Sequence, residues 1–255
     1  MVFISPLVNL ISRSIRKIGK RVVRDFNEIE KLQTSVKGTS FFANQSLEKL
    51  KKNLLFELNI IKPEFANILL NDKISEVKKN EKDCWIIKPL DGFVNFCHGI
   101  PHFCISVSIQ ENNEVLASVI YDPIKDELFA VQKNKGSFLN DSKIYVSGRG
   151  LSSDSILSCS NEVYQKKKSL NEMFDDFNEI RISGCPSLDF CYLSMGRYEI
   201  YVQTEYENYS NISGSLFLME AGGVMLKHSA NLIIATNKKI GVKIENIIKK
   251  NENGQ

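Results

Sequence analysis

The chain has 255 residues, of which 43% are apolar and 25% are charged. These values exclude a disordered or fibrous chain and fit one large domain, or two tightly joined halves, with a substantial core. The formal net charge of +3 is too small to indicate a polyanionic partner by itself.

The cysteines and the N-terminal segment indicate the compartment. The six cysteines include no C-x-x-C pair and no spacing of zinc ligands, so we expect buried thiols in a reducing environment. The apolar stretch Val2–Leu10 precedes its positive charges, which is the reverse of a secretory signal. No apolar run reaches the roughly 20 residues that span a bilayer. We therefore expect a cytoplasmic protein without a membrane span.

The first element is a long amphipathic helix. Ser5 and Pro6 fit an N-cap and a first-turn proline. Apolar residues then recur at helical spacing: Leu7, Val8, Ile11, Ile15, Ile18, Val22, Phe26 and Ile29. The opposite face is basic: Arg13, Arg16, Lys17, Lys20, Arg21 and Arg24. This face is either a solvated side of a core-packed helix or a docking face for RNA, an acidic protein or a membrane surface.

The rest of the first half mixes one helix with strands. We expect a helix at Gln45–Leu58, a strand at Ala66–Leu70 and a polar surface loop at Asn71–Asp83. The apolar run Cys84–Ile87 predicts a buried strand, which stops at Lys88–Gly92. Strand and turn signals then predict an antiparallel meander with these strands: Phe103–Ile109, Glu114–Tyr121, Glu127–Gln132 and Ile144–Ser147.

From residue 150 onward, strands alternate with helices. The expected strands are Ser155–Ser158, Ile180–Ser183, Tyr198–Val202 and Leu232–Ala235. The expected helices are Ser187–Gly196, Ser210–Ala221 and Ile240–Ile248. We therefore expect a layered α/β (α+β) protein with an N-terminal half at 1–149, which holds the antiparallel sheet, and a C-terminal half at 150–255, packed as one compact unit.

The segment 84–103 carries the most specific motif. It reads C-W-I-I-K-P-L-D-G-F-V-N-F-C-H-G-I-P-H-F and resembles the inositol monophosphatase signature W-I-I-D-P-L-D-G-T-T-N-F-x-H-G-I-P-x-F. The agreement continues at 119–129, 136–140, 181–189 and 220–223. The resemblance implies an αβαβα sandwich, a homodimer and Mg²⁺-dependent hydrolysis of small polyol or sugar phosphates, the reaction of a phosphoric monoester hydrolase.

The resemblance also implies which residues form the metal site, and several are changed. Glu76 keeps a metal-ligating acid, and Asp91 keeps another. Lys88 stands where the family has the Asp that bridges two ions, and Phe93 replaces the Thr that helps to orient the attacking water. The carbonyl of Leu90 remains available as a ligand.

The remaining positions of the implied site are changed as well. Ser210 replaces a ligating Asp, Gln203 replaces a Glu that contacts the polyol, and Pro186 replaces the small residue that lines the polyol pocket. Upstream, the motif D-x-V-T-x-x-D falls on Ser40–Ser46, where both acids are serine. The backbone N–H groups at Gly92 and Phe93 remain able to hold a phosphate oxygen.

Charge arithmetic indicates weak or absent Mg²⁺ binding. The family's central cluster offers about four negative charges, whereas Glu76, Asp91 and Lys88 together give about −1. We hypothesise that the Lys88 ammonium occupies part of the space of the bridging metal and lies within about 4 Å of both carboxylates. Alternatively, Lys88 extends to solvent, Asp91 is only a turn residue, and Glu76 is a solvated charge.

Three functions follow from these observations. The first is a family member with lost or strongly reduced activity that acts by binding. It would act as a regulatory subunit paired with a paralogue, or in transcription antitermination, in which similar bacterial proteins take part, through RNA or transcription-machinery contacts of the basic helix. The second is an active Mg²⁺-dependent phosphatase that holds one ion at Glu76, Asp91 and the Leu90 carbonyl. The third is a nucleic-acid-binding module, which low net charge and the absence of aromatic-basic interleaving disfavour.

Overall fold

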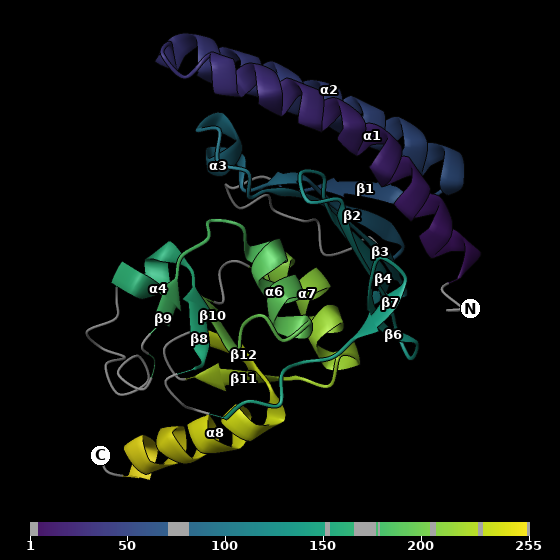
Figure 1. Ribbon diagram of the computed structural model, residues 1–255. Helices are drawn as coiled ribbons and strands as arrows, with labels where there is room; N and C mark the ends of the chain where they lie inside the picture. The colour runs from purple at the N-terminus through teal and green to yellow at the C-terminus, as the bar shows by residue number, and fades with distance from the viewer. Residues whose placement is uncertain are drawn as a thin grey trace. The chain divides into compact units, whose positions relative to one another are not determined.

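The computed structural model describes residues 5–70, 82–150, 154–165, 177, 179–204, 208–228 and 232–253. The chain divides into two compact units, Met1–Ser142 and Lys143–Gln255 (Figure 1). The expected surface loop at 71–83 falls almost wholly outside the described residues, as does Glu76. Within the described ranges, no helix is both long enough and apolar enough to cross a membrane.

Helix α1, Pro6–Lys31, is the amphipathic helix that the sequence predicts. Ser5 is its N-cap, with a side-chain oxygen that accepts a hydrogen bond from the Val8 amide at 3.4 Å. The predicted apolar stripe is buried from Val8 to Ile29. The basic residues therefore lie on the side of α1 that faces away from the core.

Helix α2, Val36–Ile61, begins nine residues before the predicted start at Gln45. Its N-cap Ser35 accepts a hydrogen bond from the Gly38 amide, and the Thr39 hydroxyl donates to the Leu32 carbonyl. This cap, the Thr39 hydrogen bonds and the burial of Thr39 and Ala43 together favour the early turns over the low helix propensities of Gly38 and Thr39. The segment Ser40–Ser46 is consequently helical.

A seven-stranded sheet completes the first unit, in the order β1-β2-β3-β4-β5-β6-β7. Its strands are β1 (Ala66–Leu69), β2 (Cys84–Asp91), β3 (Cys104–Glu111), β4 (Glu114–Asp122), β5 (Glu127–Gln132), β6 (Gly136–Leu139) and β7 (Ser142–Ile144). β1 pairs with β2 in parallel, and the pairs from β2 to β6 are antiparallel, as the predicted meander requires.

The last two strands correct the prediction of one strand at Ile144–Ser147. β6 was not predicted, and β7 ends at Ile144. Asn140 and Asp141 adopt φ values of 44° and 68°, the left-handed region that a two-residue hairpin turn uses. This turn closes a short hairpin whose second strand contains the boundary between the two units, at Ser142 and Lys143.

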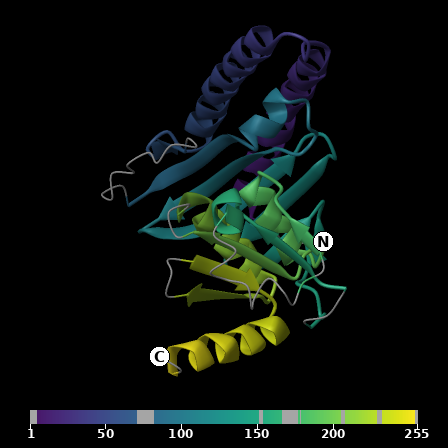
Figure 2. The ribbon, with the colours of Figure 1, turned by 90° about the vertical axis from the view of Figure 1, so that its left-hand side faces the viewer.

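Helices α1 and α2 lie side by side across one face of the sheet (Figures 1 and 2). Strand residues that point to this face, among them Trp85, Val107 and Val119, are buried in one cluster with Ile11 and Leu54. Their spacing of two along each strand matches the pleat, while the helix residues recur every three or four positions. The two periodicities together build the core of the unit.

The second unit has a five-stranded sheet in the order β11-β12-β10-β8-β9. Its strands are β8 (Ile156–Cys159), β9 (Glu179–Arg181), β10 (Ile200–Thr204), β11 (Val224–His228) and β12 (Leu232–Thr236). Its helices are α4 (Asn161–Gln165), α6 (Pro186–Ser194), α7 (Asn208–Glu220) and α8 (Lys238–Asn253). The predicted alternation of strands and helices is confirmed, and β11 and α4 are additional.

Helices cover both faces of this second sheet. Ile200 and Val202 of β10 are buried in one cluster with Ile240 of α8. Tyr201, between them, packs with Phe190 of α6 and other residues on the opposite face. The layered α+β fold expected from the sequence is therefore confirmed, since each unit combines a sheet with helical layers.

Candidate functional site

The site is centred on the end of strand β2. Lys88 pairs with Ser106 and Asp91 with Cys104, so Pro89 and Leu90 together oppose one residue of β3. This two-against-one register is a β-bulge, which locally bends the strand and redirects its side chains. The strand therefore extends in an irregular form to Asp91, into the segment Lys88–Gly92 at which it was predicted to stop.

The bulge brings Lys88 and Asp91 into direct contact. The Lys88 Nζ lies 2.7 Å from Asp91 Oδ1, and the side chains are 13% and 2% exposed. An ion pair this far from water carries a large desolvation cost, which close contact offsets only while both partners are present. Lys88 thus turns inward, and the alternative that it extends to solvent is wrong for this structure.

Gly92 follows Asp91 at a tight turn. Its φ is 81°, and an added Cβ would lie 2.8 Å from the His102 carbonyl oxygen, so glycine is required here. The Gly92 amide donates a hydrogen bond to Asp91 Oδ1 at 3.1 Å. The short helix α3, Phe93–Cys97, begins at the next residue. Asp91 Oδ1 therefore contacts both a fixed cation and a backbone donor.

Phe93 carries an aromatic ring where the implied metal site has the hydroxyl group of a threonine. It is half-buried and packs against the core of the first unit, as does the buried side chain of Leu90. A phenyl ring neither donates nor accepts a conventional hydrogen bond, so Phe93 supplies nothing that orients a water molecule. Its backbone remains the only part with polar groups.

Charged and titratable groups surround the pair within the same unit. Burial lowers the pKa of His102, the Lys125 ammonium lowers it further, and the carboxylates of Asp122 and Asp91 oppose the shift. Asp122 is fully buried and accepts hydrogen bonds from the Ile124 and Lys125 amides and, at 2.6 Å, from Lys125 Nζ. The carboxylates at 91 and 122 are therefore each matched by a lysine.

The described residues of this site do not fit a magnesium ion. Mg²⁺ requires near-octahedral oxygen ligands at about 2.0–2.1 Å and several waters. Asp91 Oδ1 already accepts from Lys88 and from the Gly92 amide, and an ammonium at 2.7 Å would repel a cation placed on the same oxygen. The carboxylate that the sequence assigns to metal binding is thus neutralised by the chain itself.

Three further predicted residues belong to the second unit. Pro186 is the first residue of α6 and is half-buried. Gln203 on β10 is fully buried, and its amide oxygen and nitrogen have no hydrogen-bond partner among the described residues. Ser210 lies in the first turn of α7, with a side chain outside the described set. A buried amide without a partner is costly, so Gln203 is suited to a polar ligand.

A second feature, on helices α1 and α2, was only half predicted. The basic face of α1 was recognised, but its partner residues Lys49 and Lys52 on α2 were not. A cavity of about 290 Å³ lies between the two helices. The lysine spacing of three residues on α2 was visible in the sequence, whereas the rotation that turns it toward α1 depends on tertiary packing.

Comparisons with known proteins bear on the family and the fold. The model of the Inositol monophosphatase family matches residues 21–253. An inositol-1-monophosphatase from Rhizobium meliloti (strain 1021) is 31% identical over 226 residues, which cover 86% of this chain and 84% of the relative. The Nus factor SuhB of Buchnera aphidicola subsp. Baizongia pistaciae is 31% identical over 228 residues, 86% of this chain and 85% of the relative. A crystal structure of the extragenic suppressor protein suhB from Bartonella henselae superposes with a TM-score of 0.81 at 28% identity, over 96% of this chain and 100% of that one.

Proposed function

Because the chain belongs to the inositol monophosphatase family, we propose that it uses the family's fold for binding, with magnesium-dependent phosphatase activity lost or strongly reduced. The match over residues 21–253 confirms the resemblance found in the segment 84–103. The fold and the retained turn glycines support a preserved backbone structure. The changed polar positions support a loss of catalytic activity.

The observation that carries this proposal is the contact between Lys88 Nζ and Asp91 Oδ1, at 2.7 Å. A lysine ammonium in place of a bridging carboxylate changes the local charge by two units. It supplies a fixed cation where the family would hold an exchangeable one, and an ammonium cannot generate a hydroxide nucleophile as a bound metal does.

The expected loss of rate is large. Metal-held water and stabilisation of the leaving oxygen are each worth several kcal/mol, and each 1.36 kcal/mol is a factor of about ten in rate. The substitutions at Lys88, Phe93 and Ser210 affect these contributions together. Residual turnover would therefore lie many powers of ten below that of an intact site.

The binding role we propose is regulatory, at the transcription machinery. Relatives called Nus factor SuhB support this assignment. The basic face of α1 offers a surface for RNA or for an acidic protein, and a homodimer would present that surface twice. The other form of the binding role is a regulatory subunit paired with a paralogue. A cytoplasmic location is part of the same proposal.

The alternative is an active phosphatase that uses one ion, with inositol monophosphate or a related small polyol or sugar phosphate as substrate. It is favoured by the retention of Asp91 and by relatives that are called inositol-1-monophosphatase. Glu76, Asp91, the Leu90 carbonyl and waters would hold the ion, the Gly92 and Phe93 backbone would hold the phosphate, and Pro186 and Gln203 would contact the substrate. Lys88 would then act on the phosphate as a point charge.

A phosphate-release assay separates these functions. Purified protein is incubated with inositol 1-phosphate and millimolar Mg²⁺, beside the control variant Glu76→Gln/Asp91→Asn. We expect equal rates for the two proteins, and a higher rate for Lys88→Asp/Ser210→Asp, which restores two acids. Magnesium-dependent release by the unmodified protein above the control would refute the loss of activity and establish the alternative.

A further inference from the structure

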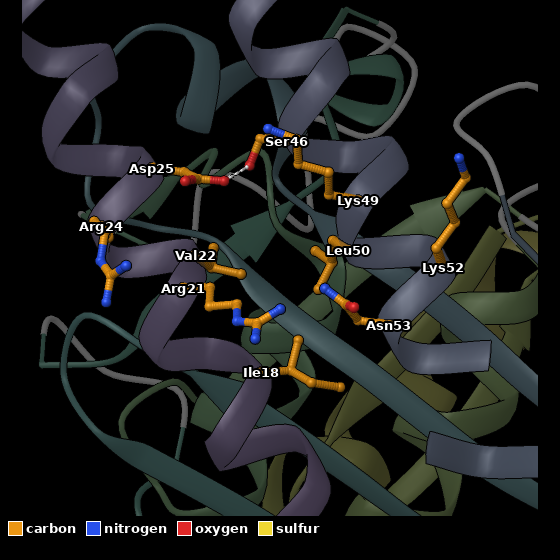
Figure 3. A pocket seen from close by; sticks show the side chains of 10 residues that line it. All are labelled: Ile18, Arg21, Val22, Arg24, Asp25, Ser46, Lys49, Leu50, Lys52 and Asn53. Atoms are coloured by element: carbon orange, nitrogen blue, oxygen red, sulfur yellow. Dashed lines mark hydrogen bonds between the residues drawn. The ribbon is translucent and has the colours of Figure 1, made fainter. Parts of the chain in front are cut away.

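A groove between α1 and α2 combines cationic walls with an apolar floor. It has a volume of about 290 Å³ and is lined by Ile18, Arg21, Val22, Arg24, Asp25, Ser46, Lys49, Leu50, Lys52 and Asn53. Figure 3 shows Arg21 extending from α1 into the space between the helices, with Lys49 on the facing helix. Arg24 and Lys52 stand at its outer edges in this view.

The groove carries a net positive charge, because four cations and a single carboxylate, that of Asp25, line it. Arg21, Arg24, Lys49 and Lys52 are exposed, and within the described residues none of them forms an ion pair or hydrogen bond. Other lysines on the same two helices are paired: Lys17 with Glu57, Lys31 with Glu28, and Lys51 with Glu48. Four unpaired cations around one cavity favour a ligand with more than one negative charge.

The remaining walls are apolar or neutral polar except for one carboxylate, that of Asp25. Ile18, Val22 and Leu50 belong to the core of the first unit and form a fixed floor. The Ser46 hydroxyl donates a hydrogen bond to the Asp25 carboxylate, which closes one end (Figure 3). Asn53 adds an amide that can both donate and accept. A ligand with a flat, weakly polar part as well as its charges would use all of these surfaces.

We propose that this groove binds a nucleoside polyphosphate. The phosphates lie against Arg21, Arg24, Lys49 and Lys52, and the nucleoside lies on the floor with Asn53 within reach of its polar edge. The volume matches the lower end of small-ligand pockets, about 300 Å³, which suits one nucleoside unit rather than a polymer track. A membrane surface is disfavoured because the apolar stripe of α1 is buried against the sheet.

The groove lining includes neither Lys88 nor Asp91, so the proposal stands whether or not the protein retains phosphatase activity. It assigns a small ligand to the part of the basic face that holds Arg21 and Arg24, where the two helices would hold it jointly. Binding would fix the two helices to each other through the ligand, because Arg21 and Lys49 approach it from opposite walls.

Isothermal titration of the full chain with adenosine 5′-diphosphate tests the proposal, with inorganic pyrophosphate and adenosine titrated separately. We expect saturable binding of the diphosphate, with pyrophosphate and adenosine each weaker by about tenfold or more, because each uses only one kind of wall. No binding of the diphosphate at millimolar concentration, or equal binding of pyrophosphate, would overturn the proposal.

Charge-reversal variants locate the binding. Arg21→Glu/Lys49→Glu should weaken the diphosphate by about a hundredfold, and the milder Arg24→Gln/Lys52→Gln by about threefold to tenfold. The matched control Lys31→Glu/Lys37→Glu also reverses one charge on each helix but lies outside the groove, and should stay within about threefold of the unmodified protein. Equal losses in the first variant and the control, or unchanged binding in both groove variants, would contradict the assignment.

Discussion

Two groups of cationic side chains in the first unit differ in burial. Lys88 turns inward at the end of β2 and contacts a carboxylate that is 2% exposed. The cations of the α1–α2 groove stay exposed and have no ion pair within the described residues. A cationic side chain therefore neutralises the Asp91 carboxylate at the end of β2, whereas the cations of the groove remain available to an anion.

The difference shows how burial decides what a cation does. A buried lysine must be paired, because an isolated ion in a low-dielectric interior is too costly. An exposed lysine loses little by remaining free, and several together produce a potential that attracts anions. In this chain Lys88 is paired with the Asp91 carboxylate, while the groove between the two helices holds exposed cations that form no ion pair within the described residues.

The largest effect is expected from breaking the buried pair. Lys88→Ala leaves Asp91 without its cation, which should lower the free energy of unfolding by about 3–5 kcal/mol. Denaturant titration measures this change. Lys17→Ala is the control, because it removes an exposed partner of Glu57, and should cost less than about 1 kcal/mol.

A double variant sharpens the comparison further. Lys88→Met/Asp91→Leu removes both charges and should recover most of the loss, because apolar replacements of a buried pair are often neutral. If Lys88→Ala cost no more than Lys17→Ala, the contact at Asp91 would contribute nothing, and the contrast between the two groups of cations would fail.

A smaller effect concerns the pH dependence of stability. Burial lowers the pKa of His102 in the folded protein, so below about pH 6.5 the unfolded chain binds more protons at this residue. The stability from neutral His102 is thus complete above that pH and declines as pH falls toward the folded pKa, by at most about 1.4 kcal/mol per pH unit.

Unfolding titrations from neutral to mildly acidic pH measure this dependence. His102→Asn should flatten the profile, whereas His98→Asn, which removes an exposed histidine from the same segment, serves as the control for substitution itself. A profile that His102→Asn leaves unchanged would show that this imidazole does not titrate with folding.

The sequence predicted the features that depend on local periodicity. The stripe from Val8 to Ile29 specified α1, and the apolar runs with Asn-rich turns specified the meander. The early start of α2 was missed because Gly38 and Thr39 are poor helix formers, whereas the Ser35 cap, the Thr39 hydrogen bonds and the burial of Ala43 together favour it. The β6–β7 hairpin was missed because Asn140-Asp141 is a weaker turn signal than Asn-Gly or Asp-Gly.

The candidate site was predictable only where residues are close in sequence. Lys88 and Asp91 lie three residues apart, and their contact requires only a bulge in one strand. The groove requires a specific rotation of α1 against α2, which depends on how Ile18, Val22 and Leu50 pack. Periodicity identified the basic face of α1, but long-range packing determined which cations share a cavity.

Calorimetric titration with Mg²⁺ decides whether Lys88 takes the place of a metal ion. The unmodified protein should give no binding heat at millimolar Mg²⁺, and Lys88→Asp/Ser210→Asp should bind, because two carboxylates are restored and the ammonium is removed. Saturable Mg²⁺ binding by the unmodified protein, lost in Asp91→Asn, would contradict the account.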